Sequence, residues 1–455
     1  MEMLFGHRIR ATILPVATVA TFALGAFALT ACEGSGSHVD GPKGAGAFGN
    51  YIAIGTGLSM GVQSGGVLYE SQVEAWPALL AHAAGAGFAF VVTDTVVSGV
   101  SRFAIPMLRA PGCQPPLVAP LRMGVYLSGV STANTDSSCA GTLNALAPPL
   151  SNLALQGATA WAALNLTPRV LLNASASYSP GDRARYPLVL GAAQSQVTAL
   201  RIEGASIVSV ELGLTEVLGA ATSGLLVPAT SYTQSSPYTY VPASVFAPVF
   251  SAIADSVKAT GAKAVLLSVP KVSALYSLRP AAELWNDREE LATFGITVTA
   301  DCGTSANLVF TATRVPSLAA AYSATGVPQS LSCIDVPGTA DAILTPADVA
   351  TLDAVVMQMN AQIQQIASQN GWAFADLVDV YPQPLSARPV YSAADQLTCV
   401  SPYGGSTSLD GVFPNLAGQA AIASAVASAI DAKYGFSIII GAASPTGVLA
   451  PRLCP

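Results

Sequence analysis

The chain has 455 residues, of which 51% are hydrophobic and only 10% are charged, and its formal net charge is -7. This length suits one large domain with insertions or two ordinary domains, and it is ample for a sizeable core. The composition argues against nucleic acid as a partner, because that interaction requires clustered lysine and arginine and no basic run follows the N-terminus.

The N-terminus has the pattern of a bacterial export signal. A short basic stretch at residues 7–10 precedes an apolar run over residues 11–29, and Leu29-Thr-Ala-Cys32 matches a lipobox, whose cysteine is acylated after cleavage. We therefore expect a signal peptide at residues 1–31, a membrane anchor through lipid on Cys32, and a flexible Gly/Ser/Ala-rich tether over residues 32–48. These features predict an exported, lipid-anchored protein of the bacterial cell envelope, in the periplasm or at the outer membrane and surface. An uncleaved transmembrane anchor is the alternative, since the apolar run is long enough for one.

The other six cysteines fit an exported protein with up to three disulfides. None of their spacings forms a C-x-x-C pair of the zinc or redox kind. We expect neither a metal nor another cofactor. Pairing between sequence neighbours is our prediction, among the many connectivities that six cysteines allow: Cys113 with Cys139, Cys302 with Cys333, and Cys399 with Cys454.

Along the chain, short apolar runs alternate with helical patterns. The runs that predict strands begin at Tyr51, Asn152, Ile207, Ala264 and Ala373, and the helices are expected from about Ser71 to Gly85, Val245 to Gly261, Thr345 to Asn370 and Asn415 to Tyr434. Two irregular stretches, near 91–149 and 271–343, are expected to be insertions. Strands separated by helices indicate a parallel sheet covered on both faces, within one domain at 49–440 that is followed by a C-terminal tail at 441–455.

Four motifs occur in an order that belongs to one enzyme family. They are Gly55-Thr-Gly-Leu-Ser-Met-Gly61, the isolated Gly157, Gly213-Leu-Thr-Glu216 and Leu409-Asp-Gly-Val-Phe-Pro-Asn415. In this respect the chain resembles the SGNH, or GDSL, esterases and lipases, and particularly their bacterial lipoprotein-type members. The resemblance implies a three-layer α/β/α sandwich with about five parallel strands in a flavodoxin-like topology, and a carboxylic ester hydrolase as the ancestral activity.

The resemblance fails at the positions that perform the chemistry. The family's nucleophilic serine corresponds to Gly57, its oxyanion asparagine to Thr215 and its general-base histidine to Phe413, while Gly157 and Asp410 are kept. Glycine has no side chain that could attack a carbonyl, and phenylalanine cannot accept a proton. Removal of one member of a catalytic triad already costs several orders of magnitude in rate.

Three other sites could be imagined in the same sequence. Gly57-Leu-Ser-Met-Gly61 spells the nucleophile elbow G-x-S-x-G, which would make Ser59 the nucleophile, but no histidine follows His82, which we interpret as a surface residue in the last turn of its helix. Gly55-x-Gly57 begins a dinucleotide fingerprint whose third glycine is replaced by Met60. Glu211, Glu216 and Asp410 could form a metal or glycosidase site, although a structural role as helix caps explains Glu216 equally well.

We therefore expect a catalytically inactive SGNH-like lipoprotein that acts as an envelope binding or structural protein, with an acyl or glycan group as a ligand of the inherited cleft. The alternative is an active ester hydrolase that uses Ser59. Ester hydrolysis that disappears in a Ser59→Ala variant would distinguish the second hypothesis from the first.

Overall fold

The computed structural model describes residues 43–90, 150–232, 238–382 and 391–441, apart from residues 65, 68, 175–177, 179, 399 and 401. These residues belong to one compact unit that starts at Gly41. Several predictions lie outside the described residues: the signal peptide, the anchor on Cys32, most of the tether, the insertion near 91–149, most of the tail, and Cys113, Cys139, Cys399 and Cys454.

A parallel sheet of four strands lies at the centre. Its strands are β1 (Tyr51–Gly55), β4 (Ile207–Glu211), β5 (Lys263–Leu267) and β11 (Ala373–Ala375), in the order β1-β4-β5-β11. Side chains along each strand alternate between two cores, as the period of a strand requires: Ile52 and Ile54 point into one, Tyr51 and Ala53 into the other. The predicted mixed α/β class with a parallel sheet is confirmed.

The expected strand at Asn152 is present only as an extended segment beside β1. Its backbone follows β1 in parallel through hydrogen bonds from Leu153 N to Ala53 O at 2.8 Å and from Leu155 N to Gly55 O at 3.1 Å. One isolated bridge, between Ala53 and Asn152, is the regular part of this pairing.

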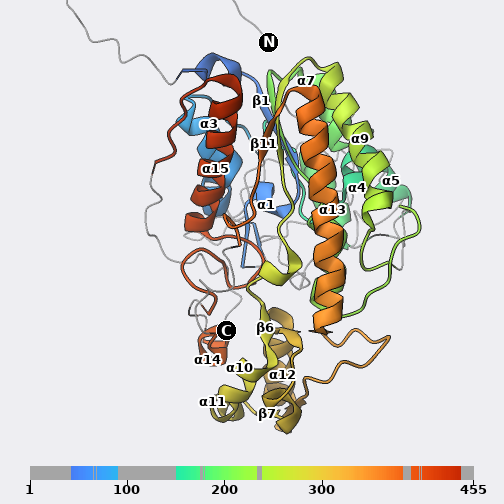
Figure 1. Ribbon diagram of the computed structural model, residues 1–455, viewed down its shortest axis with the longest axis vertical. Coiled ribbons are helices and arrows are strands. Elements are labelled where there is room, and N and C mark those ends of the chain that lie inside the picture. The colour runs from blue at the N-terminus through green and yellow to red at the C-terminus, as the bar shows by residue number, and fades with distance from the viewer. Residues whose placement is uncertain are drawn as a thin grey trace, which may run out of the picture. The chain divides into compact units, whose positions relative to one another are not determined.

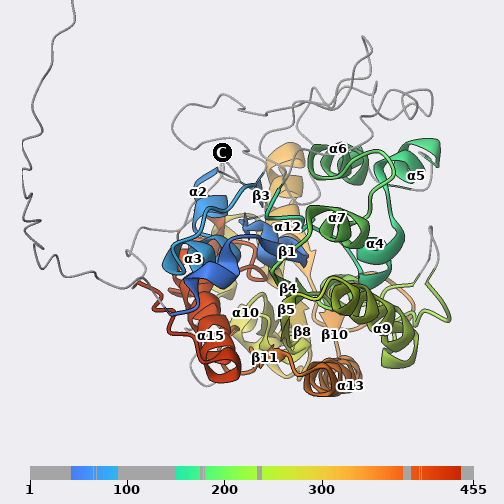
Figure 2. The same ribbon diagram turned by 90° about the horizontal axis from the view of Figure 1, so that it is seen from above.

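Helices cover both faces of the sheet (Figure 1). On one face lie α4 (Ala160–Asn165), α7 (Gln196–Glu203), α9 (Ala243–Ala259) and α13 (Pro346–Asn370), and on the other α3 (Trp76–Ala83) and α15 (Leu416–Tyr434). Seen from above, α9 and α13 stand across the sheet from α15 and α3 (Figure 2). The described part of the chain therefore has a helical layer on each side of its sheet.

The predicted helix ends agree with the capping residues. Thr345 and Asp348 form a capping box at the start of α13, and Gly371, at φ 68°, ends that helix. Asn415 accepts hydrogen bonds from the first turn of α15, and Gly435 ends it with φ 68°. The helix expected from about Ser71 to Gly85 is instead divided into α2 (Tyr69–Val73) and α3, because Pro77 stands in the first turn of α3, where a missing N–H is tolerated.

Residues 276–344 form a lobe with its own small core at one end of α13 (Figure 1). An antiparallel sheet joins β10 (Ile343–Leu344), β8 (Leu308–Phe310) and β6 (Leu278–Pro280), and β7 (Ile296–Val298) pairs with β9 (Gln329–Leu331) in parallel. The lobe also holds α10 (Ala281–Asn286), α11 (Arg288–Thr293), η6 (Ala300–Gly303) and α12 (Thr311–Thr325). This lobe accounts for most of the region that the sequence suggested was an insertion.

The remaining elements are short. They are η1 (Ala45–Phe48), α1 (Gly57–Met60), the hairpin β2 (Val62–Gln63) and β3 (Gly66–Val67), α5 (Pro168–Asn173), α6 (Pro180–Val189), α8 (Thr215–Ser223), η5 (Val272–Ala274) and α14 (Ala393–Leu397). Phe48 is fully buried, so the folded part of the chain extends back into the stretch expected to be a tether.

Candidate functional site

The glycine-rich turn after β1 is a buried helical turn and not an open loop. Thr56 caps α1, with its Oγ1 accepting a hydrogen bond from Leu58 N at 3.4 Å, and every residue of α1 is buried. The turn therefore lies at the carboxyl end of the sheet, where α/β folds usually place their ligand sites, but it presents no side chain to solvent.

The first and last motifs meet at Gly57 and Phe413. A Cβ atom added to Gly57 would lie 2.9 Å from both Cε1 and Cζ of Phe413 and 3.0 Å from Cγ2 of Val62. The Phe413 side chain is only 3% exposed. The phenyl ring thus occupies the space into which a side chain at position 57 would point.

Asp410 stabilises the turn that presents this ring. Its Oδ1 accepts hydrogen bonds from Val412 N at 2.9 Å and from Phe413 N at 2.7 Å. The carboxylate is buried. Asp410 therefore holds the backbone of its own turn, a role that requires no imidazole.

Ser59 points into the protein and not into a cleft. Its hydroxyl donates to Oε2 of Glu211 at 2.9 Å, and the residue is fully buried. Glu211, the last residue of β4, also accepts from Thr56 N and Thr56 Oγ1. Burial raises the pKa of the Glu211 carboxyl to about 7, although the hydrogen bonds from Thr56 and Ser59 oppose that rise.

Three buried amide side chains fix the backbone around the same turn. Gln196 accepts from Gly55 N at 2.9 Å and donates to Gly55 O at 3.1 Å, Asn152 donates to Ser59 O at 2.9 Å, and Gln419 donates to Leu58 O at 3.2 Å. Sequence reasoning missed all three. They satisfy backbone groups that burial would otherwise leave unpaired, so the turn is held in place from α7, from the segment beside β1 and from α15.

The second and third motifs are joined by Glu216. Its Oε1 accepts from Ala160 N at 2.6 Å and from the hydroxyl of Tyr232 at 2.8 Å, and the carboxyl is fully buried. Burial raises the pKa of Glu216 to about 7, against the effect of these hydrogen bonds. Thr215, the first residue of α8, is half-buried beside it. Glu216 thus anchors the start of α4.

Gly157 is the member of the motif set with an exposed backbone. It occupies a tight turn, closed by the hydrogen bond from Ala158 N to Leu155 O, at φ 80°, which only glycine adopts easily. A Cβ atom there would be 3.9 Å from Nη2 of Arg185 and 4.0 Å from Oδ1 of Asp182. Charged side chains from α6 therefore border this glycine.

His82 lies exposed in the last turn of α3, as expected from the sequence. The hydroxyl of Ser59 donates its hydrogen bond to Glu211 and not to a histidine. The helix C-terminus favours a basic side chain at the position of His82, which explains the residue without a catalytic role.

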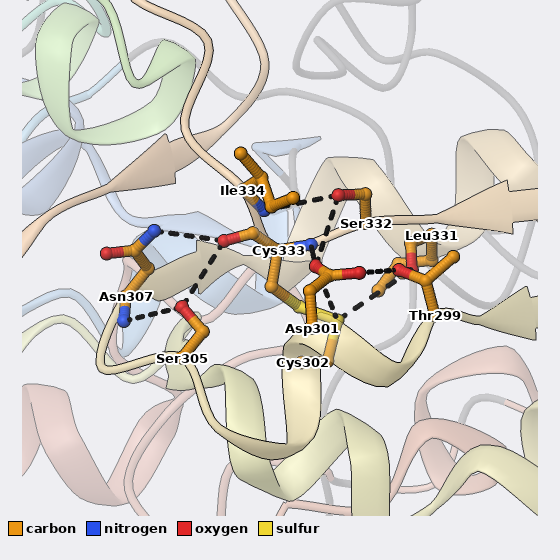
Figure 3. Close-up of a disulfide and its surroundings, with 9 residues drawn as sticks. All are labelled: Thr299, Asp301, Cys302, Ser305, Asn307, Leu331, Ser332, Cys333 and Ile334. Atoms are coloured by element: carbon orange, nitrogen blue, oxygen red, sulfur yellow. Dashed lines mark hydrogen bonds between the residues drawn. A yellow bond between two sulfur atoms is a disulfide. The ribbon is translucent and has the colours of Figure 1, made fainter.

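Among the described residues, Glu211, Glu216 and Asp410 do not belong to a group of ligands close enough to hold a metal. Within the part of the chain that the structure describes, the group of His, Cys, Asp or Glu ligands close enough for a metal is Asp301, Cys302 and Cys333. These cysteines form a disulfide, which confirms one predicted pair (Figure 3). Asp301 accepts from Cys333 N at 2.7 Å and from Ser332 Oγ at 3.1 Å, so its carboxylate stabilises the loop of the lobe.

A surface cavity of about 210 Å³ lies between α13 and the carboxyl end of β11. Its polar lining includes Lys271, Asn360 and Asp376. Asn360 already holds Val269 through both its amide atoms, and Asp376 accepts from Ser268. None of the motif residues lines this cavity, so it is separate from the contact between Gly57 and Phe413.

The comparisons with known proteins add no assignment: no family model, no curated protein and no solved structure matches the chain. Among the helices of the described residues, none combines the length and the apolar character that crossing a membrane requires.

Proposed function

We propose that the chain is a non-hydrolytic, SGNH-like protein of the bacterial cell envelope, anchored through Cys32, that works by binding or as a structural component. The observation that carries this proposal is the phenyl ring of Phe413 packed against Gly57. The same ring stands where the resemblance expects a base and fills the space that a nucleophile needs.

The order of the strands supports the SGNH-like frame. With the segment 151–155 beside β1, the sheet reads, in chain order of its segments, second, first, third, fourth, fifth. This is the order of flavodoxin-like doubly wound sheets. The motif residues also lie at the carboxyl end of this sheet, since Gly55 ends β1 and Glu211 ends β4.

The chemistry of the centre supports a loss of hydrolysis. Acyl transfer needs a nucleophile, a base within hydrogen-bond reach and donors for the oxyanion. Position 57 offers only a hydrogen atom, Phe413 offers a hydrocarbon ring, and Thr215 replaces the amide donor. An acyl or glycan ligand, as proposed for the cleft, would have to lie beside the ring and not in its place.

Restoration of the three lost groups tests the proposal. The full chain, purified in detergent, is assayed on p-nitrophenyl butyrate, together with a variant that combines Gly57→Ser, Thr215→Asn and Phe413→His. An imidazole ring has one atom fewer than the phenyl ring, so the combined variant has room that Gly57→Ser alone lacks. We expect no turnover by the natural chain and measurable turnover by the combined variant.

The matched control keeps Thr215→Asn and Phe413→His but carries Gly57→Ala, which supplies the Cβ atom without the hydroxyl. It should be inactive. A combined variant that folds, as judged by circular dichroism, but hydrolyses nothing would contradict the SGNH-like arrangement of these positions.

An ester hydrolase that uses Ser59 is the second candidate. The hydrogen bond from Ser59 to Glu211 is the observation in its favour, because it pairs a hydroxyl with a carboxylate base. The complete burial of Ser59 opposes it. Turnover by the natural chain that is lost in Ser59→Ala but kept in Thr56→Ser would establish this candidate and overturn the first.

The anchor is tested separately in cells. Metabolic labelling with an alkyne analogue of palmitate should mark the natural chain and leave a Cys32→Ser variant unlabelled. Equal labelling of both would refute lipidation at Cys32.

A further inference from the structure

The surface cavity of about 210 Å³ beside α13 lies between one face of a helix and one face of a strand. The helix α13 contributes Met357, Asn360 and Gln364, at positions i, i+3 and i+7, which share one face of a helix. The chain at β11 contributes Phe374 and Asp376, which are two positions apart and therefore lie on one face of the extended backbone. Because β11 is the edge strand of the sheet and α13 stands next to it (Figure 2), the cavity lies at that edge.

The walls of this cavity are held by hydrogen bonds to the chain that follows β5. Asn360 accepts from Val269 N through Oδ1 at 2.7 Å and donates to Val269 O through Nδ2 at 2.9 Å. The hydroxyl of Ser268 donates to Oδ1 of Asp376 at 3.0 Å, and the same oxygen accepts from Val378 N at 3.0 Å. These contacts give the cavity a defined shape, as ligand sites usually have.

Two opposite charges line the cavity without neutralising each other. The ammonium group of Lys271, a half-buried residue, has neither a hydrogen bond nor an ion pair within the described residues. No ion pair in that part of the chain joins it to Asp376. Both hydrogen bonds to Asp376 end at Oδ1, which leaves Oδ2 able to accept another. An apolar surface completes the lining, with Phe374 half-buried against the first core and Met357 exposed.

We propose that this cavity binds a small zwitterion with an apolar side chain, of the class of the aliphatic α-amino acids. The ligand carboxylate accepts from the ammonium group of Lys271, and the ligand ammonium group donates to Oδ2 of Asp376. Charge-assisted hydrogen bonds of this kind are stronger than neutral ones. The apolar side chain lies against Phe374 and Met357. A volume of about 210 Å³ is below the roughly 300–1,000 Å³ of pockets for drug-sized ligands, so it admits only a smaller molecule.

The two charges also determine which ligands are rejected. An anion without an ammonium group is attracted by Lys271 but repelled by Asp376, and a cation without a carboxylate meets the reverse. Only a ligand with both charges gains both contacts. The cavity is separate from the contact between Gly57 and Phe413, so the proposal does not depend on whether the chain hydrolyses esters.

The test compares three ligands that share one branched carbon skeleton. Leucine carries both charges, 4-methylpentanoate lacks the ammonium group, and 3-methylbutylamine lacks the carboxylate. Isothermal titration calorimetry measures the binding of each to the full chain in detergent at pH 7 and constant ionic strength, and the heat of titration into detergent alone is subtracted. We expect saturable binding of leucine and binding at least about 10-fold weaker for each analogue, the value of one lost hydrogen bond between charged groups.

Two variants that each remove one charge assign the contacts. Lys271→Met keeps the stem of the side chain and should weaken leucine binding by about 10-fold, while 3-methylbutylamine should bind equally well or more tightly. Asp376→Asn keeps an acceptor for Ser268 and should weaken the binding of leucine but not that of 4-methylpentanoate. Lys258→Met, at an exposed lysine in the last turn of α9, is the matched control and should change leucine binding by less than about 2-fold.

Three results would overturn the proposal. One is the absence of saturable leucine binding. Another is an analogue that binds as tightly as leucine, because the cavity would then not recognise both charges. The third is leucine binding that Lys271→Met or Asp376→Asn leaves unchanged in a variant that folds, as judged by circular dichroism, which would place the ligand elsewhere. If neither variant folds, the three ligands on the natural chain still decide.

Discussion

The contact between Gly57 and Phe413 predicts that Gly57→Ala destabilises the natural chain but not a chain that carries Phe413→Ala. The four chains of this double-mutant cycle measure the difference. Gly57→Ala adds one Cβ atom, and two of the three nearest atoms that it meets, at 2.9 Å, belong to the ring of Phe413. Such distances are shorter than van der Waals contact, so the ring or the turn must move. Gly57 is the first residue of α1, so its backbone itself accepts alanine.

The expected magnitudes follow from packing. Gly57→Ala should destabilise the natural chain by about 1–3 kcal/mol, the usual cost of overpacking a core. Phe413→Ala should lower the free energy of unfolding by about 3–5 kcal/mol, because it leaves a cavity where the phenyl ring was. In that second background the added methyl group fills part of the cavity, so Gly57→Ala should become neutral or stabilising. The coupling free energy between the two positions is then about 1–3 kcal/mol.

Urea denaturation followed by far-ultraviolet circular dichroism measures the free energy of unfolding of all four chains. Gly46→Ala is the control, because Gly46 is exposed and a Cβ atom there meets nothing within 4 Å. It should change stability by less than about 0.5 kcal/mol in both backgrounds. If Gly57→Ala cost the same with and without the ring, the phenyl group would not occupy the space at position 57, and the proposed loss of the centre would lose its main support.

Three further predictions concern stability. The pKa values of Glu211 and Glu216, near 7, lie above the ordinary 4.5, so folding favours their protonated forms. The contribution of these two carboxyls to stability should therefore be greatest below pH 4.5 and should fall as the pH rises to 7, by about 3 kcal/mol per carboxyl. Glu211→Gln should remove its share of this pH dependence in denaturation curves measured at several pH values. Cys302→Ser opens a disulfide that joins positions 31 residues apart, and it should destabilise the lobe by about 3–4 kcal/mol. Limited proteolysis should then cleave the lobe of the variant earlier than that of the natural chain, and equal protease resistance would contradict this. Thr345→Ala removes the capping box of α13 and should lower the free energy of unfolding, measured in urea, by about 1 kcal/mol. Thr351→Ala, at an exposed position of the same helix, is the control and should lower it by less. Equal losses would assign the effect to helix propensity.

The sheet and its main helices could be predicted because their signals are local. A strand buried on both faces is a continuous apolar run, as at Tyr51 and Ala264, and helix ends carry their own capping residues, as at Thr345 and Gly435. The division of the first helix by Pro77 was also a local signal, and it was overlooked. The four helices between Ala160 and Glu203 were not anticipated, because they are short and several begin at a Thr or Ser cap rather than in a long amphipathic pattern.

The candidate site could be predicted only in part, because a motif gives the position of a residue and not its direction. The pattern Gly57-x-Ser59-x-Gly61 is the same whether the serine points to solvent or to Glu211. Ser59 lies in a turn whose backbone is fixed by Gln196 and Gln419, which bond to Gly55 O and Leu58 O, are far from it in sequence and have no motif of their own. One signal was available: Glu211 ends an apolar strand, and a charged residue at such a place needs donors.

The two substitutions at the centre also complement each other in size. Under the proposed SGNH-like arrangement, position 57 lacks the side chain of a nucleophile and position 413 carries a ring larger than imidazole. The ring of Phe413 lies where a side chain at position 57 would point. Gly57→Ser alone would therefore crowd the core and supply a nucleophile without a base, while Phe413→His alone would supply a base with nothing to activate. Under this proposal each single substitution restores no chemistry, and Gly57→Ser also costs stability, so the packing of Phe413 against position 57 opposes a stepwise return to hydrolysis.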